Sequence, residues 1–255
     1  MHQKLLILKN ILLKEKDRRK NENNKYDWDK NSRENQKTPD GNWRIWLILA
    51  GRGFGKTRTG AETIRQWATS GLYKRIAIIG DTWTSTVNVI VEGVSGLLAC
   101  HPPTERPIFE KSKRKIIWPN GAVAEIFSSE AYEQLRGPQF DAAWIDELAK
   151  FRYLEQTWNQ LMLGLRLGNN PRCIVTTTPR PLPFLQSLMT RNDTHVTRGS
   201  TLENKDNLAK DYLETILHQF KGTRLAEQEI KGHILTSNSE SLWTPSLIQY
   251  KGISL

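Results

Sequence analysis

The sequence contains little cysteine and no long apolar run. Two cysteines occur in 255 residues, Cys100 and Cys173, and their separation fits no metal-ligand spacing. This excludes a disulfide framework and suits a reducing, cytoplasmic compartment. No apolar run approaches the about 20 residues of a membrane-spanning helix, so no membrane partner is expected. The first ten residues, MHQKLLILKN, lack the small-residue cleavage site typical of a signal peptide.

Acidic residues are also scarce relative to basic ones. The chain has 37 Lys and Arg against 27 Asp and Glu, which gives a net charge of +10 and a pI near 9.6. An excess of this size favours an anionic partner, above all nucleic acid, although a general lysine bias gives the same balance. The length permits one large α/β domain with a small appendage.

From residue 45 onward, strand-like and helix-like segments alternate. Residues 14–37 are rich in charged and amide side chains and are interpreted as a solvated arm, and the turn TPDGNW at 38–43 opens the folded part. Strands separated by helices predict an α/β fold with a mostly parallel central sheet flanked by helices. The expected strands are 45–50, 75–80, 142–146, 172–178 and 195–200, with a hairpin at 115–127; the expected helices are 56–69, 153–166, 207–220 and 223–231.

A glycine-rich loop follows the first apolar run. Its glycines permit backbone torsions that turn N–H groups toward a phosphate, and the next helix directs its positive end at the same anion. A P-loop motif has glycine at its first position, where this chain has Ala50. The alternative is a chance glycine-rich loop. The predicted ATP-binding residues are Gly51, Arg52, Gly53, Phe54, Gly55, Lys56 and Thr57, with Lys56 on the phosphates and the Thr57 hydroxyl on Mg²⁺.

Two acidic residues and a row of threonines end two later strands. The apolar run 142–145 leads into Asp146 and Glu147. We expect Asp146 to share the Mg²⁺ with Thr57, and Glu147 to polarise the attacking water of a hydrolase. The stretch Thr176–Thr178 places hydroxyls at the same edge, where they can report the γ-phosphate; plain β-propensity of threonine is the alternative.

Together these segments resemble a known family. GNWRIWLILAGRGFGKTRTGAE, VEGVSGLLA, WPNGAVAEIFS, EQLRGPQFDAAWIDELAKF, TWNQLMLGLRLG, VTTTPRP and VTRGST are similar to segments of phage and prophage terminase large subunits, over about residues 33 to 250. The resemblance implies an ATPase motor that moves double-stranded DNA into a procapsid. It also implies a P-loop NTPase fold of the additional-strand type with a small helical lid subdomain.

The family pattern assigns further roles. Arg52 stands where the family often has a basic residue near the γ-phosphate, and Thr177 lies in the coupling motif. Gln36 resembles the glutamine that reads adenine. Arg136, in LRGPQ, is a candidate for completing a neighbouring subunit's site in a ring, with a plain surface arginine as the alternative. The implied partners are double-stranded DNA, a portal protein, a small terminase subunit and further copies of the chain in the bacterial host cytoplasm.

The same pattern sets the expected domains: an N-terminal arm at 1–37, the ATPase core at 38–204, and a lid with a truncated linker at 205–255. Family members usually continue into a nuclease, and no strand with a metal-binding Asp follows Trp243. We therefore expect no DNA cleavage by this chain alone. Two other functions stay open: a degenerate prophage remnant that binds nucleotide without motor output, and a helicase-like ATPase.

Overall fold

The computed structural model describes residues 24–220, 223–232 and 234. The predictions for 1–23 and for the end of the chain from 235 onward lie outside these residues. Within the described ranges, no helix has both the length and the apolar character needed to cross a membrane.

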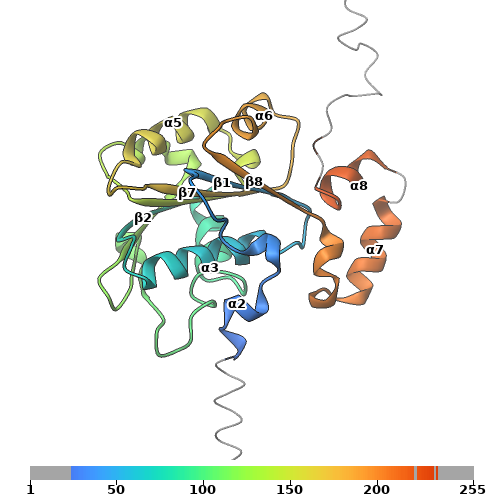
Figure 1. Ribbon diagram of the computed structural model, residues 1–255, viewed down its shortest axis with the longest axis horizontal. Coiled ribbons are helices and arrows are strands. Elements are labelled where there is room, and N and C mark those ends of the chain that lie inside the picture. Colours follow the sequence, from blue (N-terminus) through green and yellow to red (C-terminus); the bar gives the residue numbers. More distant parts are fainter. Residues whose placement is uncertain (1–23, 221–222, 233, 235–255) are drawn as a thin grey trace, which may run out of the picture.

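An eight-stranded sheet forms the centre of the molecule (Figure 1), and its order is β3-β4-β5-β2-β6-β7-β1-β8. Neighbouring strands are parallel from β5 through β2, β6, β7 and β1 to β8. The β3–β4 and β4–β5 pairs are antiparallel. β7 lies between β1 and β6, which is the additional-strand order. The strands are β1 (Ile45–Ala50), β2 (Arg75–Gly80), β3 (Ile108–Glu110), β4 (Lys115–Ile117), β5 (Val123–Ser128), β6 (Ala142–Asp146), β7 (Arg172–Thr177) and β8 (Thr194–Gly199).

Helices cover both faces of this sheet. In Figure 1, α5 and α6 lie over one face, α2 and α3 lie over the other, and α7 and α8 stand together beyond β8. Short 3₁₀ segments connect these elements, and η2 is a π-helical turn. The helices are α2 (Trp28–Asn31), α3 (Lys56–Thr69), α4 (Trp83–Ser85), α5 (Leu154–Gly164), α6 (Pro183–Met189), α7 (Lys210–Phe220) and α8 (Arg224–Glu229); the short segments are η1 (Glu34–Gln36), η2 (Thr86–Val91), η3 (Lys111–Lys113), η4 (Ser129–Leu135), η5 (Leu148–Lys150) and η6 (Thr201–Asn207).

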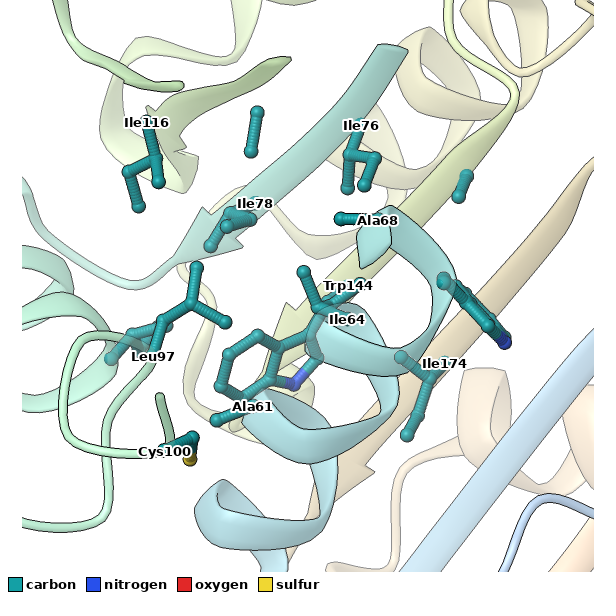
Figure 2. Packing of buried hydrophobic residues seen from close by; sticks show 14 of the residues in the cluster. Ala61, Ile64, Ala68, Ile76, Ile78, Leu97, Cys100, Ile116, Trp144 and Ile174 are labelled. Atoms are coloured by element: carbon teal, nitrogen blue, oxygen red, sulfur yellow. The ribbon is translucent and has the colours of Figure 1, made fainter. Parts of the chain in front are cut away.

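Two apolar clusters hold the layers together, one on each face of the sheet. The central strands are buried on both faces, which explains their unbroken apolar runs. On the α3 face, Trp144 of β6 packs beside Ala61 and Ile64 (Figure 2). Gly60 allows this approach, because a Cβ there would lie 2.2 Å from the Trp144 ring. The close packing fixes the first turn of α3, and with it the phosphate loop.

The predicted fold class is confirmed, including the parallel sheet and its strand order. The hairpin at 115–127 is also confirmed as β4 and β5, paired antiparallel. The elements that the sequence did not predict are short; they include α2, β3, α4, η2, η4 and α6. Runs of three to seven residues give too few repeats for a period to stand out.

One interpretation needs correction. Residues 24–37 were expected to be solvated, yet Trp28 is 9% exposed and Gln36 only 4%. Trp28 lies under the Arg58 guanidinium of α3, whose carbon is 6.0 Å from the ring centroid. The Arg65 guanidinium also donates to the Tyr26 carbonyl oxygen, at 2.9 Å. The charged composition of the segment hid two side chains that anchor it on α3.

Candidate nucleotide site

The loop between β1 and α3 has the backbone of a phosphate cradle. Gly53 has φ +79° and Gly55 has φ +100°, torsions that side-chain-bearing residues rarely adopt. At Gly51 the limit is space, because a Cβ would lie 2.4 Å from the Ile230 carbonyl oxygen. Ala50 is the last residue of β1 and is absent from the positive-φ positions. The loop therefore needs its three glycines and accepts an alanine at the first motif position.

Lys56 occupies the first turn of α3 and points back across the loop. Its Nζ donates to the carbonyl oxygens of Ala50, at 2.9 Å, and Gly51, at 3.1 Å. It also donates to the Thr178 hydroxyl at 3.1 Å, and lies 3.8 Å from Oε1 of Glu147. Burial lowers the pKa of this ammonium, while Glu147 and Asp146 oppose that shift. A cation held here over the loop can reach a bound phosphate.

Asp146 and Thr57 meet at the same place. The Thr57 hydroxyl lies 3.3 Å from Oδ2 of Asp146, and the Thr176 hydroxyl donates to Oδ1 at 2.5 Å. Burial raises the pKa of Asp146 to about 6, against the lowering effect of the Thr176 hydrogen bond. No cluster of three or more His, Cys, Asp and Glu exists among the residues described. One carboxylate and one hydroxyl fit Mg²⁺, which takes few protein ligands and completes its shell with water and phosphate.

Glu147 turns out of β6 in a left-handed conformation, with φ +58°. Such a torsion is costly for a side-chain-bearing residue and is common at functional sites. Its carboxylate lies 3.8 Å from the Nζ atoms of both Lys56 and Lys150, and accepts from the backbone N–H of Thr178 at 3.4 Å. The side chain keeps 23% exposure. This carboxylate can therefore meet both the phosphate-side cation and water.

The three threonines of β7 and its end point in different directions. Thr176 contacts Asp146 and accepts from the Trp144 indole N–H at 3.0 Å. Thr178 contacts Lys56. The Thr177 hydroxyl instead accepts from the backbone N–H of Ala149 in η5, at 3.0 Å. The hydroxyl of Thr177, the residue predicted to couple hydrolysis to motion, thus bonds the segment that follows Glu147, while those of Thr176 and Thr178 bond Asp146 and Lys56.

The other predicted residues separate into two groups. Arg52 and Gln36 lie at the loop: Arg52 is 3.5 Å from the Glu229 carboxylate, and Gln36 donates to the Thr59 hydroxyl at 2.9 Å. Arg136 follows η4 and lines a different hollow, of about 440 Å³, with Gly137 and Pro138. It is not brought to the phosphate loop of its own chain, so its role toward a neighbouring subunit stays a prediction.

A hollow of about 930 Å³ opens above the loop. Lys56, Thr57 and Glu147 line it, together with residues that the sequence reasoning missed. These additional residues come from the N-terminal segment, α3, the η2 region and η6; they include Asn31, Arg33, Arg58, Asn88 and Asn204. Arg58 directly follows the P-loop motif, whereas the others stand outside the motifs used for the prediction and are revealed by the fold.

The fold and the site together define a P-loop NTPase domain of the additional-strand type. A sequence model of the family described as terminase large subunit, T4likevirus-type, N-terminal, matches residues 47–250. This is about four fifths of the chain, and the chain belongs to that family. A search of curated protein sequences finds no match.

Solved structures agree on the fold. The large terminase of a thermophilic bacteriophage in complex with ADP has a TM-score of 0.62 at 14% identity, covering 83% of this chain and 52% of that one. The same protein with ATP-gamma-S gives 0.60 at 15%, covering 83% and 51%. The ATPase domain of the Thermus phage P74-26 large terminase gives 0.58 at 12%, covering 76% and 90%. The chain thus spans about half the length of the first of these large terminases.

Proposed function

We propose that this chain is an ATPase motor subunit of a terminase, which hydrolyses ATP to move double-stranded DNA into a procapsid. One observation carries the proposal: charged and hydroxyl side chains at the ends of three neighbouring strands meet at one loop. They are Lys56 and Thr57 after β1, Asp146 and Glu147 at the end of β6, and Thr176 in β7. Thr57 and Asp146 are 3.3 Å apart, and Lys56 and Glu147 are 3.8 Å apart. Family membership supplies the packaging context.

In this mechanism, residues 51–57 cradle the phosphates of ATP, and Thr57 and Asp146 hold Mg²⁺, which neutralises phosphate charge when bound. Glu147 orients the attacking water. Arg52, or Arg136 from a neighbouring subunit, stabilises the charge that develops on the transferred phosphoryl group. Gln36 reads the base. The loss of the γ-phosphate is transmitted through Thr177 to the lid.

The proposed partners follow from the same context. They are double-stranded DNA, a portal protein, a small terminase subunit and further copies of the chain in a ring within the host cytoplasm. Contacts to DNA are with the phosphate backbone, so they are independent of sequence and weaken with salt. The net charge of +10 supports such contacts.

A Glu147→Gln variant tests the catalytic assignment. We expect MgATP binding to persist while turnover falls by at least about 100-fold, because the amide cannot act as a base. Glu155→Gln, an exposed substitution on α5, is the matched control and should hydrolyse ATP like the wild type. Near wild-type turnover by Glu147→Gln removes Glu147 from this role.

The motor assignment has its own measurement. ATP hydrolysis is followed with and without linear duplex DNA and purified portal, at two salt concentrations. Stimulation by both, with the DNA effect weakening at higher salt, supports a packaging motor. Nucleotide binding without turnover identifies a degenerate remnant, and equal stimulation by single-stranded nucleic acid identifies a helicase-like ATPase.

A further inference from the structure

Three side chains hold the backbone carbonyl groups of the phosphate loop. The carbonyl oxygens of residues 52–54 are consecutive, and each accepts a side-chain hydrogen bond. The Thr201 hydroxyl donates to the first at 2.6 Å, Asn204 Nδ2 to the second at 2.7 Å, and Arg33 Nη2 to the third at 2.5 Å. We call Arg33, Thr201 and Asn204 the outer clasp. None of them was predicted from the sequence.

Arg33 and Asn204 also bind each other. Arg33 Nη1 donates to Asn204 Oδ1 at 2.7 Å, and the guanidinium carbon lies 4.7 Å from the centroid of the Phe54 ring. Phe54 is fully buried, and a Cβ at Gly199 would lie 2.1 Å from its ring. Arg33 therefore holds both Asn204 and the loop, and Asn204, which also accepts from Asn207 Nδ2 at 3.0 Å, holds both Arg33 and the loop. The Phe54 ring beneath them cannot shift freely.

The clasp also joins the loop to the helices beyond β8. Thr201 and Asn204 belong to η6, which leads into α7, and Asn204 marks a kink in η6 with φ −107° and ψ 15°. The end of α8 is bonded to the loop as well, since the backbone N–H of Arg52 donates to the carbonyl oxygen of Glu229, the last residue of α8, at 2.7 Å. A change in loop shape must therefore move η6 and α8 or break these hydrogen bonds.

We propose that the outer clasp positions the phosphate loop. When nucleotide binds or leaves, the clasp transmits the resulting change in the loop directly to η6 and α7. With its carbonyl groups held by the clasp, the loop can present N–H groups to a phosphate. The N–H groups of Gly51, Arg52 and Phe54 are not among these, because they donate to other carbonyl oxygens. The inference rests on the proposed nucleotide site. It adds a second route between that site and the helices beyond β8, separate from the one through Thr177. Arg33 Nε is buried with no hydrogen-bond partner in the described part of the chain, which leaves a donor at the same hollow.

Three variants of the full chain test the clasp. Asn204→Asp removes the donor to residue 53 while keeping an acceptor for Arg33. Arg33→Lys keeps the charge but lacks the planar fork whose two nitrogens reach Asn204 and Phe54 at once. Asn35→Ala is the matched control: Asn35 Nδ2 also bridges the N-terminal segment to η6, through Glu203 at 2.5 Å, but touches no loop carbonyl.

The first readout needs no nucleotide. Amide hydrogen exchange of residues 51–57 in the free chain should accelerate by about 10-fold in Asn204→Asp and Arg33→Lys, as expected for losing one partly buried hydrogen bond. Exchange in β1 and β6 should stay at wild-type rates, which shows that the fold is intact. Asn35→Ala should leave the loop unchanged.

The second readout uses ATP-gamma-S with Mg²⁺. Its affinity and the KM for ATP should weaken by about 10-fold in both clasp variants, while kcat changes by less than about 3-fold because Lys56 and Glu147 are untouched. Nucleotide should slow exchange in α7 of the wild type and of Asn35→Ala, but not of Asn204→Asp. Wild-type loop exchange with wild-type KM in both clasp variants would overturn the proposal. A wild-type chain that hydrolyses no ATP contradicts the proposed function instead, and the nucleotide-free measurement still decides the clasp.

Discussion

The two edges of the central sheet treat charge in opposite ways. At the carboxyl edge, where β1, β6 and β7 end, Lys56 and Asp146 are 6% and 5% exposed. At the amino edge, arginines stand at or next to the first residues of β1, β2 and β7: Arg44, Arg75 and Arg172. Arg75 is exposed and the other two are half-buried. The sheet thus buries charges at its carboxyl edge and leaves them half-buried or exposed at its amino edge.

The charges at the carboxyl edge belong to the proposed catalytic site, whereas the arginines at the amino edge belong to the surface. Burying an ion costs free energy unless partners compensate, and the carboxyl edge supplies those partners through hydroxyls and carbonyl oxygens. The amino-edge arginines find ordinary surface contacts: the Arg172 guanidinium lies 4.0 Å from the Trp43 ring centroid, and Arg44 donates to the Leu165 carbonyl oxygen at 3.0 Å. Such contacts each contribute on the order of 1 kcal/mol to stability and take no part in the proposed chemistry. Substitutions at the two edges should therefore differ in kind.

The largest expected effect is on turnover at the carboxyl edge. Asp146→Asn keeps the side-chain shape but removes the charge proposed to hold Mg²⁺. We expect the rate of phosphate release in saturating MgATP to fall by at least about 100-fold. An amide variant with more than a tenth of wild-type turnover would show that Mg²⁺ is held by other groups.

The same substitution should stabilise the metal-free protein. The pKa of Asp146 is raised to about 6 in the folded chain from an ordinary 3.8. Between these values the folded state keeps a proton that the unfolded state has lost, so the free energy of unfolding falls as pH rises from about 4 through about 6. The deficit above pH 6 is on the order of 2 to 3 kcal/mol. In Asp146→Asn the amide does not titrate, so the free energy of unfolding should not show this fall.

Urea unfolding in EDTA at pH 4 and pH 7.5 measures the effect. The wild type should lose more stability than Asp146→Asn between the two pH values, and the variant should be the more stable of the two at pH 7.5. Equal pH dependence of both proteins would place the cost of the buried charge elsewhere.

A smaller effect distinguishes the threonines of β7. Thr176→Val removes the hydroxyl that donates to Asp146, and we expect about a 10-fold loss of turnover, with Thr176→Ser restoring most of it. Thr177→Val removes the acceptor for the Ala149 N–H, so it should lower the free energy of unfolding by about 1 to 2 kcal/mol. Steady-state hydrolysis and urea unfolding of each variant separate the two outcomes.

The sequence predicted which residues share the carboxyl edge of the sheet, but not which of their side chains face the site. Apolar runs ending in Gly51, Asp146 and Thr176 predicted that these residues share one edge, because parallel strands end together. Which threonine faces the site depends on the pairing of Asp146 with Thr176 across β6 and β7. That register is set by packing between strands and is not encoded in either strand alone.

Other parts of the site depend on contacts between distant segments. Arg33 and Asn204 are 171 residues apart and meet only because the N-terminal segment and η6 converge on the loop. Residues 24–37 have the composition of a solvated arm, and the burial of Trp28 and Gln36 reverses that interpretation. Local pattern cannot reveal a segment whose few anchoring side chains are outnumbered by charged ones.

The smallest effect belongs to the amino edge, where Arg75→Gln should change neither quantity appreciably. Arg75 is exposed at the start of β2, and its backbone N–H, not its guanidinium, bonds the Asp141 carboxylate at 3.0 Å. We expect turnover within about 2-fold of wild type and a free energy of unfolding within about 0.5 kcal/mol. The assays are those used for Asp146→Asn. A turnover change of 5-fold or more, at unchanged stability, would mean that the two ends of the strands are energetically coupled, and the separation of chemistry from surface charge would then not hold.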